Sequence, residues 1–125
     1  MVVPEVDLAT FLAHADGAFV LDVREPGEYR AGHVPGARLL PLAAVPTRLG
    51  ELPTDRPVFV ICATGNRSLT AAAWMQRAGI DAWSVSGGTS AWARAGQPVA
   101  TGPGQAANDG ARQRPGDQDR EGRER

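Results

Sequence analysis

The sequence predicts a single α/β domain built on a mainly parallel β-sheet. Strand-like and helix-like segments alternate over roughly the first hundred residues, an order typical of sheets covered by helices. The apolar segment 58–61 shows no polar alternation, as expected for a parallel strand that is buried on both faces. A chain of 125 residues is long enough for one domain with one modest core.

The first half of the chain is expected to contain two strands and two short helices. Asp7 is suited to cap the start of a helix over 8–14, because its carboxylate can accept a hydrogen bond from a free N–H group there. The apolar segment 18–21 predicts a buried strand. Residues 25–31 suit a short helix with a proline in its first turn, and 37–40 favours a further strand.

The second half continues the alternation after the strand at 58–61. Residues 41–49, which precede that strand, indicate a weak helix or a turn. Residues 68–78 carry an apolar stripe at helical spacing, and Gly79 suits the position just past the helix end. Residues 82–85 predict another strand, and a last helix is expected over 89–96.

The end of the sequence differs in composition from the rest. From residue 102 onward it contains Gly, Pro, Gln, Asp and Arg but no large apolar residue. Such a segment buries too little surface to offset its ordering entropy. We therefore expect residues 1–100 to form the domain and residues 101–125 to form a disordered polar tail.

Composition disfavours several classes of function. With 13 basic and 14 acidic residues the formal net charge is −1, so no strong field recruits nucleic acid or an anionic membrane. No apolar run approaches the roughly 20 residues that span a bilayer, and the N-terminus lacks the basic region of a secretory signal. A single cysteine excludes an intrachain disulfide. We therefore expect a cytoplasmic protein.

Cys62 is the most informative candidate residue. It lies where the apolar strand 58–61 runs into the loop 62–68, ahead of a predicted helix. Backbone N–H groups and the positive end of a helix favour the thiolate, which is the reactive form of cysteine. The alternative is a small buried hydrophobic residue, but the polar residues beside Cys62 indicate a tight turn rather than a core.

The residues after Cys62 are candidates for binding an anionic substrate. Successive N–H groups in a tight loop form an anion-binding nest, and glycine permits the conformation this requires. The guanidinium of Arg67 could bind an anion or could simply be solvated at the helix start, and Ser68 could cap the helix. The candidate residues are Ala63, Thr64, Gly65, Asn66, Arg67 and Ser68.

Asp22, Arg24 and His33 each have two interpretations. Asp22 or Arg24 could be a catalytic acid or a substrate clamp, but an acid near Cys62 would oppose thiolate formation, which favours a structural pair. His33 could act as a general base, although bracing a turn rich in Gly and Pro is favoured. With two histidines and one cysteine far apart in the sequence, we expect no metal site.

Several segments together resemble a known family. They are Leu-Asp-Val-Arg at 21–24, Glu-Tyr at 28–29, Gly-His-Val-Pro-Gly-Ala at 32–37, Cys-Ala-Thr-Gly-Asn-Arg-Ser at 62–68, and Gly-Gly at 87–88 followed by Trp92. In this order they resemble the rhodanese domain, and the resemblance covers about residues 3–98.

The resemblance has implications for both fold and site. It implies a rhodanese-like three-layer domain with a central, mainly parallel five-stranded sheet flanked by helices. It also implies that Cys62 is the nucleophile that carries a persulfide, with the amides of residues 63–67 around its sulfur. Asp22, Arg24 and His33 match positions that are mainly structural in the family, and no cofactor is implied.

The implied activity is transfer of sulfane sulfur. A small anionic donor such as thiosulfate would load Cys62, and cyanide or a thiol would accept the sulfur. Because the sequence has no second cysteine, the acceptor must be an external thiol or a sulfur-acceptor protein. One alternative is a sulfur-relay or regulatory module. Another is a phosphatase or arsenate reductase, two classes of enzyme that are similar to rhodanese-like domains. The loop that those enzymes resemble has five residues between its Cys and its Arg, whereas four residues separate Cys62 from Arg67 here.

Overall fold

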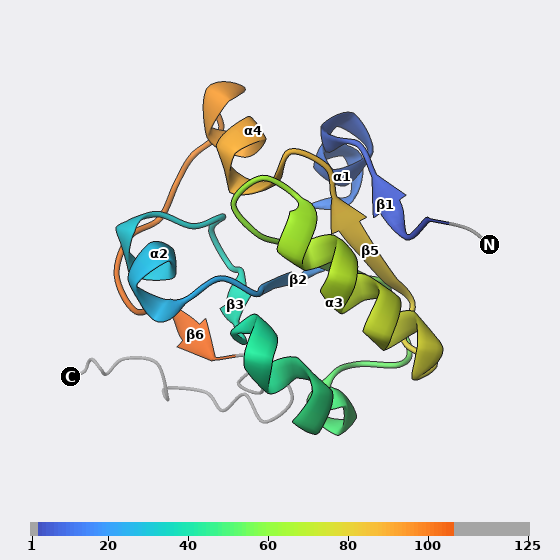
Figure 1. Ribbon diagram of the computed structural model, residues 1–125. Helices are drawn as coiled ribbons and strands as arrows, with labels where there is room; N and C mark the ends of the chain where they lie inside the picture. The colour runs from blue at the N-terminus through green and yellow to red at the C-terminus, as the bar shows by residue number, and fades with distance from the viewer. Residues whose placement is uncertain (1–2, 107–125) are drawn as a thin grey trace.

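The computed structural model describes residues 3–106, and Figure 1 shows the arrangement of its elements. The strands are β1 (Glu5–Val6), β2 (Phe19–Asp22), β3 (Arg38–Leu39), β4 (Val58–Ile61), β5 (Ala82–Val85) and β6 (Gln105–Ala106). The α-helices are α1 (Leu8–His14), α2 (Pro26–Ala31), α3 (Asn66–Arg77) and α4 (Gly88–Arg94). Two short 3₁₀ helices, η1 (Leu42–Thr47) and η2 (Leu49–Glu51), precede β4.

The six strands form one sheet in the order β1-β5-β4-β2-β3-β6. Every neighbouring pair is parallel, so the predicted α/β class is confirmed. The central strands β2 and β4 are buried along their whole length. This explains why neither strand shows polar alternation in the sequence.

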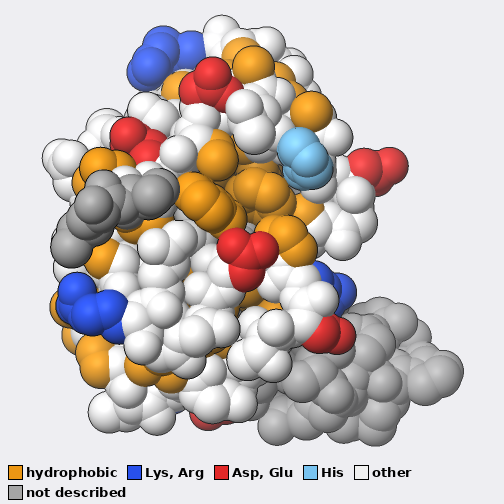
Figure 2. All heavy atoms as spheres, turned by 90° about the vertical axis from the view of Figure 1, so that its right-hand side faces the viewer, with side chains coloured by type: hydrophobic (Ala, Val, Ile, Leu, Met, Phe, Trp, Pro, Cys, Tyr) orange, Lys and Arg blue, Asp and Glu red, His pale blue; other side chains and the backbone are white. Residues whose placement is uncertain are grey.

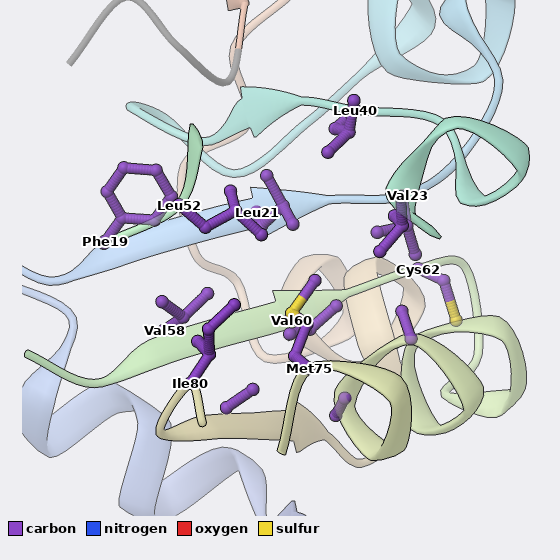
Figure 3. Packing of buried hydrophobic residues seen from close by; sticks show 14 residues of the cluster. Phe19, Leu21, Val23, Leu40, Leu52, Val58, Val60, Cys62, Met75 and Ile80 are labelled. Carbon is purple, nitrogen blue, oxygen red and sulfur yellow. The ribbon is translucent and has the colours of Figure 1, made fainter. Parts of the chain in front are cut away.

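Alternate side chains of β4 supply two hydrophobic clusters, one on each face of the sheet. Val58 and Val60 pack in the cluster covered by α3 and η1, which Figure 3 shows from close by. Phe59 and Ile61 pack on the other face, where Phe11 of α1 and Trp92 of α4 also contribute to the core. Helices therefore cover both faces, and the domain has the expected three layers.

Local signals account for two of the helix starts. Asp7 accepts a hydrogen bond from the Thr10 N–H at 2.8 Å and caps α1, as predicted. The N-terminus of helix α2 is capped by a reciprocal capping box, in which the side chains of Glu25 and Glu28 each accept a hydrogen bond from the backbone N–H of the other residue. The segment 41–49, expected to be a weak helix or turn, contains η1 and the start of η2.

The sheet has six strands rather than the five expected. Strand β6 lies within the stretch 101–125, which was expected to be a polar tail, and it pairs with β3. Strand β1, at the opposite edge, was also not predicted from its residues. Both edge strands contain only two residues, too few to carry a hydrophobic period. The remainder of the expected tail, 107–125, lies outside the described residues.

Figure 2 shows the face that carries β1 and α1, over which hydrophobic side chains gather beside a histidine. A pocket of about 170 Å³ is lined by residues that include His14, Phe19, Arg56 and Phe59. Phe19 begins β2 and Phe59 lies near the start of β4, so this pocket is at the amino ends of the strands, opposite the edge at which Cys62 lies.

In residues 3–106, no helix is long and apolar enough to cross a membrane.

Candidate active site

Three loops meet at the carboxyl edge of the sheet, which is where ligands bind in open α/β sheets. The N–H of Val23, after β2, donates to the Ile61 carbonyl at 3.0 Å. The N–H of Thr89, in the first turn of α4, donates to the Cys62 carbonyl at 2.8 Å. A cleft of about 300 Å³ lies beside them, lined by residues that include Glu28 and Ala63.

Cys62 follows the last residue of β4 and is only 1 % exposed. Figure 3 shows its sulfur directed towards the first turn of α3. The Gly65 N–H donates to Sγ at 3.1 Å, and the hydroxyl of Ser68 lies 3.3 Å from Sγ. The Ser68 hydroxyl is also hydrogen-bonded to that of Ser84 at 2.7 Å. The sulfur is therefore held by a backbone amide and by a buried pair of hydroxyl groups.

These hydrogen bonds set the acidity of Cys62. Burial is the largest single influence and raises the pKa of the thiol, because it disfavours the charged form. Hydrogen bonds from the Ser68 side chain and from the backbone N–H groups of Ser68, Gly65 and Thr64 lower the pKa, and together they outweigh burial. The net pKa of Cys62 lies below the ordinary value of a thiol, which favours the nucleophilic thiolate.

Two glycines allow the loops to approach closely. Gly65 has φ +111°, and a Cβ there would lie 3.2 Å from the backbone nitrogen of Gly87. Gly88 has φ +58°, and a Cβ there would collide with the Cys62 carbonyl oxygen and lie 2.7 Å from the Ala63 carbonyl. A side chain at either position would push the start of α4 away from the cysteine loop.

Ser68 does not cap α3, contrary to the prediction. The helix begins two residues earlier, at Asn66, and its N-cap is Gly65 in the left-handed conformation. Ser68 is therefore the third residue of the helix and is fully buried. This position turns its hydroxyl towards Cys62 rather than towards a free N–H of the helix. Thr64, another candidate residue of the loop, contributes a backbone N–H hydrogen bond that lowers the pKa of Cys62.

Arg67 is paired with a carboxylate on α2. Its two terminal nitrogens bond the two carboxylate oxygens of Glu28 at 2.8 and 2.9 Å. Glu28 Oε1 also accepts the Glu25 N–H at 3.0 Å. The hydrogen bond from Arg67, followed by that from Glu25, lowers the pKa of Glu28 to about 2. The guanidinium that the sequence offered for an anionic substrate is thus already neutralised within the protein.

Asp22, Arg24 and His33 occupy bracing positions. Arg24 bonds the Asp22 carboxylate at 2.8 Å and the Gly32 carbonyl at 2.7 Å, which ties the end of β2 to the turn after α2. The Nδ1 atom of His33 is 2.7 Å from the Tyr29 carbonyl oxygen, and the His33 ring stacks on that of Tyr29. Asp22, Arg24, Tyr29 and His33 are buried, and their contacts agree with the favoured structural interpretation.

Two contributors to the site were not predicted from the sequence. Ser84 supports the Ser68 hydroxyl from β5; the only local signal was a serine inside an otherwise apolar strand. Glu28 fixes Arg67 from a position 39 residues away, and no local pattern indicates that pairing. Within residues 3–106, no cluster of three or more His, Cys, Asp or Glu side chains could hold a metal ion.

The fold and the loop define a parallel α/β domain that presents a thiolate-stabilising nest at the carboxyl edge of its sheet. The rhodanese-like domain family matches residues 7–95. A sulfurtransferase of Allochromatium vinosum is 37 % identical over 101 residues, covering 78 % of this chain and 94 % of the relative. The thiosulfate sulfurtransferase GlpE of Pseudomonas putida is 40 % identical over 96 residues, covering 76 % and 86 %.

Solved structures agree with these relatives. A rhodanese-related protein from Thermoplasma volcanium superposes with a TM-score of 0.75 at 31 % identity, covering 78 % of this chain and 98 % of its own. A thiosulfate sulfurtransferase from Pseudomonas aeruginosa gives 0.69 at 28 % identity, covering 82 % and 21 %. The chain belongs to the rhodanese-like family, and the two curated relatives named above are sulfurtransferases.

Proposed function

We propose that this protein transfers sulfane sulfur from a small anionic donor, such as thiosulfate, to a thiophilic acceptor through a persulfide on Cys62. The observation that carries the proposal is the environment of Cys62 Sγ, where hydrogen bonds from Gly65 and Ser68 lower the pKa of a buried thiol. The thiosulfate specificity named for a relative of 40 % identity supports this choice of donor.

The first step is a displacement at sulfur. The Cys62 thiolate attacks the outer sulfur of thiosulfate with its electron pair and forms a new S–S bond. The bond between the two sulfur atoms of thiosulfate breaks, and sulfite leaves with that electron pair. The product is a Cys62 persulfide anion, so no net charge is gained or lost. The backbone N–H groups of Thr64, Gly65 and Ser68, together with the Ser68 hydroxyl, would stabilise the negative charge before and after transfer.

The second step removes the outer sulfur. Cyanide or a thiolate attacks it, forms a bond to it and releases the Cys62 thiolate. The sequence holds no second cysteine that could resolve the persulfide by forming an intrachain disulfide, so the acceptor is an external thiol or a sulfur-acceptor protein. Both steps are displacements at sulfur, which need neither a metal nor an organic cofactor. A cytoplasmic location stays a prediction.

A second candidate function is also compatible with the single cysteine. The protein would then be a sulfur-relay module that delivers its sulfur to a partner protein. The two candidates share the loading step and differ in the acceptor. Rapid discharge of the persulfide by cyanide or a small thiol supports a free-standing transferase. A persulfide that is stable to small thiols but is discharged by a protein thiol supports the relay. A phosphatase is disfavoured because the loop between Cys62 and Arg67 contains four residues.

The test is mass spectrometry of the intact protein after exposure to thiosulfate. We expect the mass to rise by one sulfur atom, the added sulfur to map to Cys62, and cyanide to remove it. A Cys62→Ser variant should gain nothing, since an alcohol at this position forms no persulfide. If the wild-type protein gains no sulfur from thiosulfate or from other sulfane donors, the proposal is wrong.

A further inference from the structure

Glu28 belongs to two parts of the site at once. Its side chain helps to line the cleft beside Ala63, the residue that follows the nucleophile. The same carboxylate bonds the guanidinium of Arg67, the cation that ends the cysteine loop. The charge of Glu28 therefore lies in the cleft beside the cysteine loop and on the guanidinium expected to attract an anionic donor.

The position of the Glu28 carboxylate is fixed by several contacts. Oε1 accepts the Glu25 N–H at 3.0 Å, which closes the capping box of α2, and it also accepts from Arg67 at 2.8 Å. The hydrogen bonds to Arg67 are bidentate, the most directional form of such a pair. Releasing Arg67 to a substrate would break both bonds, because the cap holds Glu28 in place.

The charges at the cleft balance one another. Arg24 and Glu28 are the charged side chains that line it within residues 3–106. Arg24 is neutralised by the buried Asp22, and Glu28 is paired with Arg67. The negative charge of Cys62 favours the charged form of Arg67 and raises its pKa, although the Glu28 hydrogen bond is the larger cause. Among the described residues, neither the arginine that lines the cleft nor Arg67 lacks a carboxylate partner that could be exchanged for an incoming anion.

We propose that Glu28 is a specificity-determining residue that makes the site discriminate against sulfur donors in proportion to their negative charge. The inference rests on the proposed sulfurtransferase function and refines its substrate class. By neutralising Arg67, Glu28 removes an attraction that would favour a dianion such as thiosulfate over monoanionic sulfane donors, a class that includes organic persulfides. Glu28 acts on donor binding and does not touch the sulfur being transferred.

The test compares two donors that differ by one charge. Thiosulfate is a dianion, and methanethiosulfonate is a monoanion that also presents an outer sulfur and leaves as a sulfinate. Glu28→Gln keeps one oxygen that can accept from the Glu25 N–H and from one nitrogen of Arg67, but it removes the second acceptor for Arg67 and the charge. Coulomb energy is linear in charge, so we expect KM to fall about three- to tenfold for thiosulfate and only about two- to threefold for methanethiosulfonate. The value of kcat should change little, because charge acts on binding.

Glu51→Gln is the matched control. Glu51 forms an ion pair with Arg48 whose side chains are 40 % and 34 % exposed, close to the 38 % and 36 % of Glu28 and Arg67. Glu51 does not line the cleft. This variant changes the net charge of the protein by the same amount, and we expect both KM values to stay at the wild-type level. High salt should narrow the difference between Glu28→Gln and wild type through screening.

A charge series makes the test independent of one variant. Arg67→Gln should raise KM for thiosulfate more than for methanethiosulfonate, and the double variant Glu28→Gln/Arg67→Gln should return both values towards wild type. If Glu28→Gln leaves KM for thiosulfate unchanged, or shifts both donors equally, while Cys62 still forms a persulfide, the inference is wrong and the proposed function stands. If neither donor loads wild-type Cys62, the proposed function fails and the inference fails with it.

Discussion

At the scale of single residues, the chemistry of Cys62 depends on a hydroxyl that lies behind it. Ser68 bridges Cys62 Sγ and the hydroxyl of Ser84, and both serines are fully buried. A chain of hydrogen bonds in a buried environment polarises each member, so the hydroxyl nearest the sulfur becomes a better donor. The strand that carries Ser84 therefore influences the acidity of Cys62 through Ser68.

Removing the Ser68 hydroxyl should weaken the thiolate. In Ser68→Ala, Cys62 loses its strongest acidifying contact, so its pKa rises and its thiolate fraction at neutral pH falls. A hydrogen bond worth about 1 kcal/mol corresponds to roughly a fivefold lower fraction. The measurement is the rate of Cys62 alkylation by iodoacetamide across pH, whose midpoint should move to higher pH.

Ser84→Ala serves as the graded companion to that variant. It leaves the Ser68 hydroxyl in contact with Cys62 but removes the group that polarises it, so the midpoint should shift in the same direction by less. A midpoint for Ser68→Ala equal to that of wild type would show that backbone amides alone set the acidity of Cys62.

The lowered pKa of Glu28 leads to a second prediction, which concerns how the free energy of unfolding depends on pH. Because its pKa is lowered to about 2 in the folded protein, its ion pair contributes stability that is fully present above the unfolded pKa of about 4.3. That contribution is lost as pH falls towards 2. We expect Glu28→Gln to be less stable than wild type at pH 7 and to converge with it near pH 2, as measured by urea unfolding. A stability difference that is constant from pH 7 to pH 2 would contradict the assignment.

Sequence reasoning succeeded for the site residues whose role depends on their neighbours in the chain. It was less successful for the residues whose role depends on partners far away in the sequence. Cys62 and Gly65 could be found because a strand, a tight turn and a helix follow one another there. Arg67 was found, but its neutralisation was not, because Glu28 lies 39 residues earlier. The role of Ser68 was misjudged because a shift of two residues in the helix start changes which side of the helix it faces.

At the scale of elements, the cysteine loop is held by the start of α4. The N–H groups of Thr89 and Ser90 donate to the carbonyl oxygens of Cys62 and Ala63 at 2.8 and 3.0 Å. With these carbonyls bound on one side, the N–H groups of the loop are free to point towards the sulfur. The start of α4 thus braces the cysteine loop from a distant part of the sequence, which explains why the double glycine belongs to the recognisable pattern.

Gly88→Ala should separate these two elements. Its Cβ would collide with the Cys62 carbonyl oxygen, and the residue would be held at φ +58°. We expect a loss of about 3 kcal/mol or more in the free energy of unfolding, with slower alkylation of Cys62. The control is Gly79→Ala, at φ +88° with nothing within 4 Å, which should cost only about 1 kcal/mol of backbone strain. Equal losses would mean that close packing at Gly88 is unimportant.

At the scale of the whole molecule, the fold class could be predicted but the edges of the sheet could not. The buried strands β2 and β4 lack polar alternation, as expected for strands of a sheet covered on both faces. The edge strands β1 and β6 have two residues each and exist because a neighbouring strand offers unpaired backbone groups. Such pairing depends on the assembled sheet, so the sequence placed residues 101–125 wholly outside the domain.

The extra strand gives a prediction about where the folded domain ends. Beyond residue 100, the Gly102 N–H donates to the Arg30 carbonyl at 2.9 Å, β6 pairs with β3, and Gly104 lies so close to the Tyr29 ring that a Cβ would be 2.7 Å from it. Deleting residues 101–125 should therefore lower the midpoint of urea unfolding, by the equivalent of about 1–2 kcal/mol for a few lost hydrogen bonds. Deleting only 107–125, a segment without large apolar residues, should leave the midpoint unchanged. If both truncations unfold at the wild-type midpoint, β6 adds nothing to stability and the domain ends near residue 100.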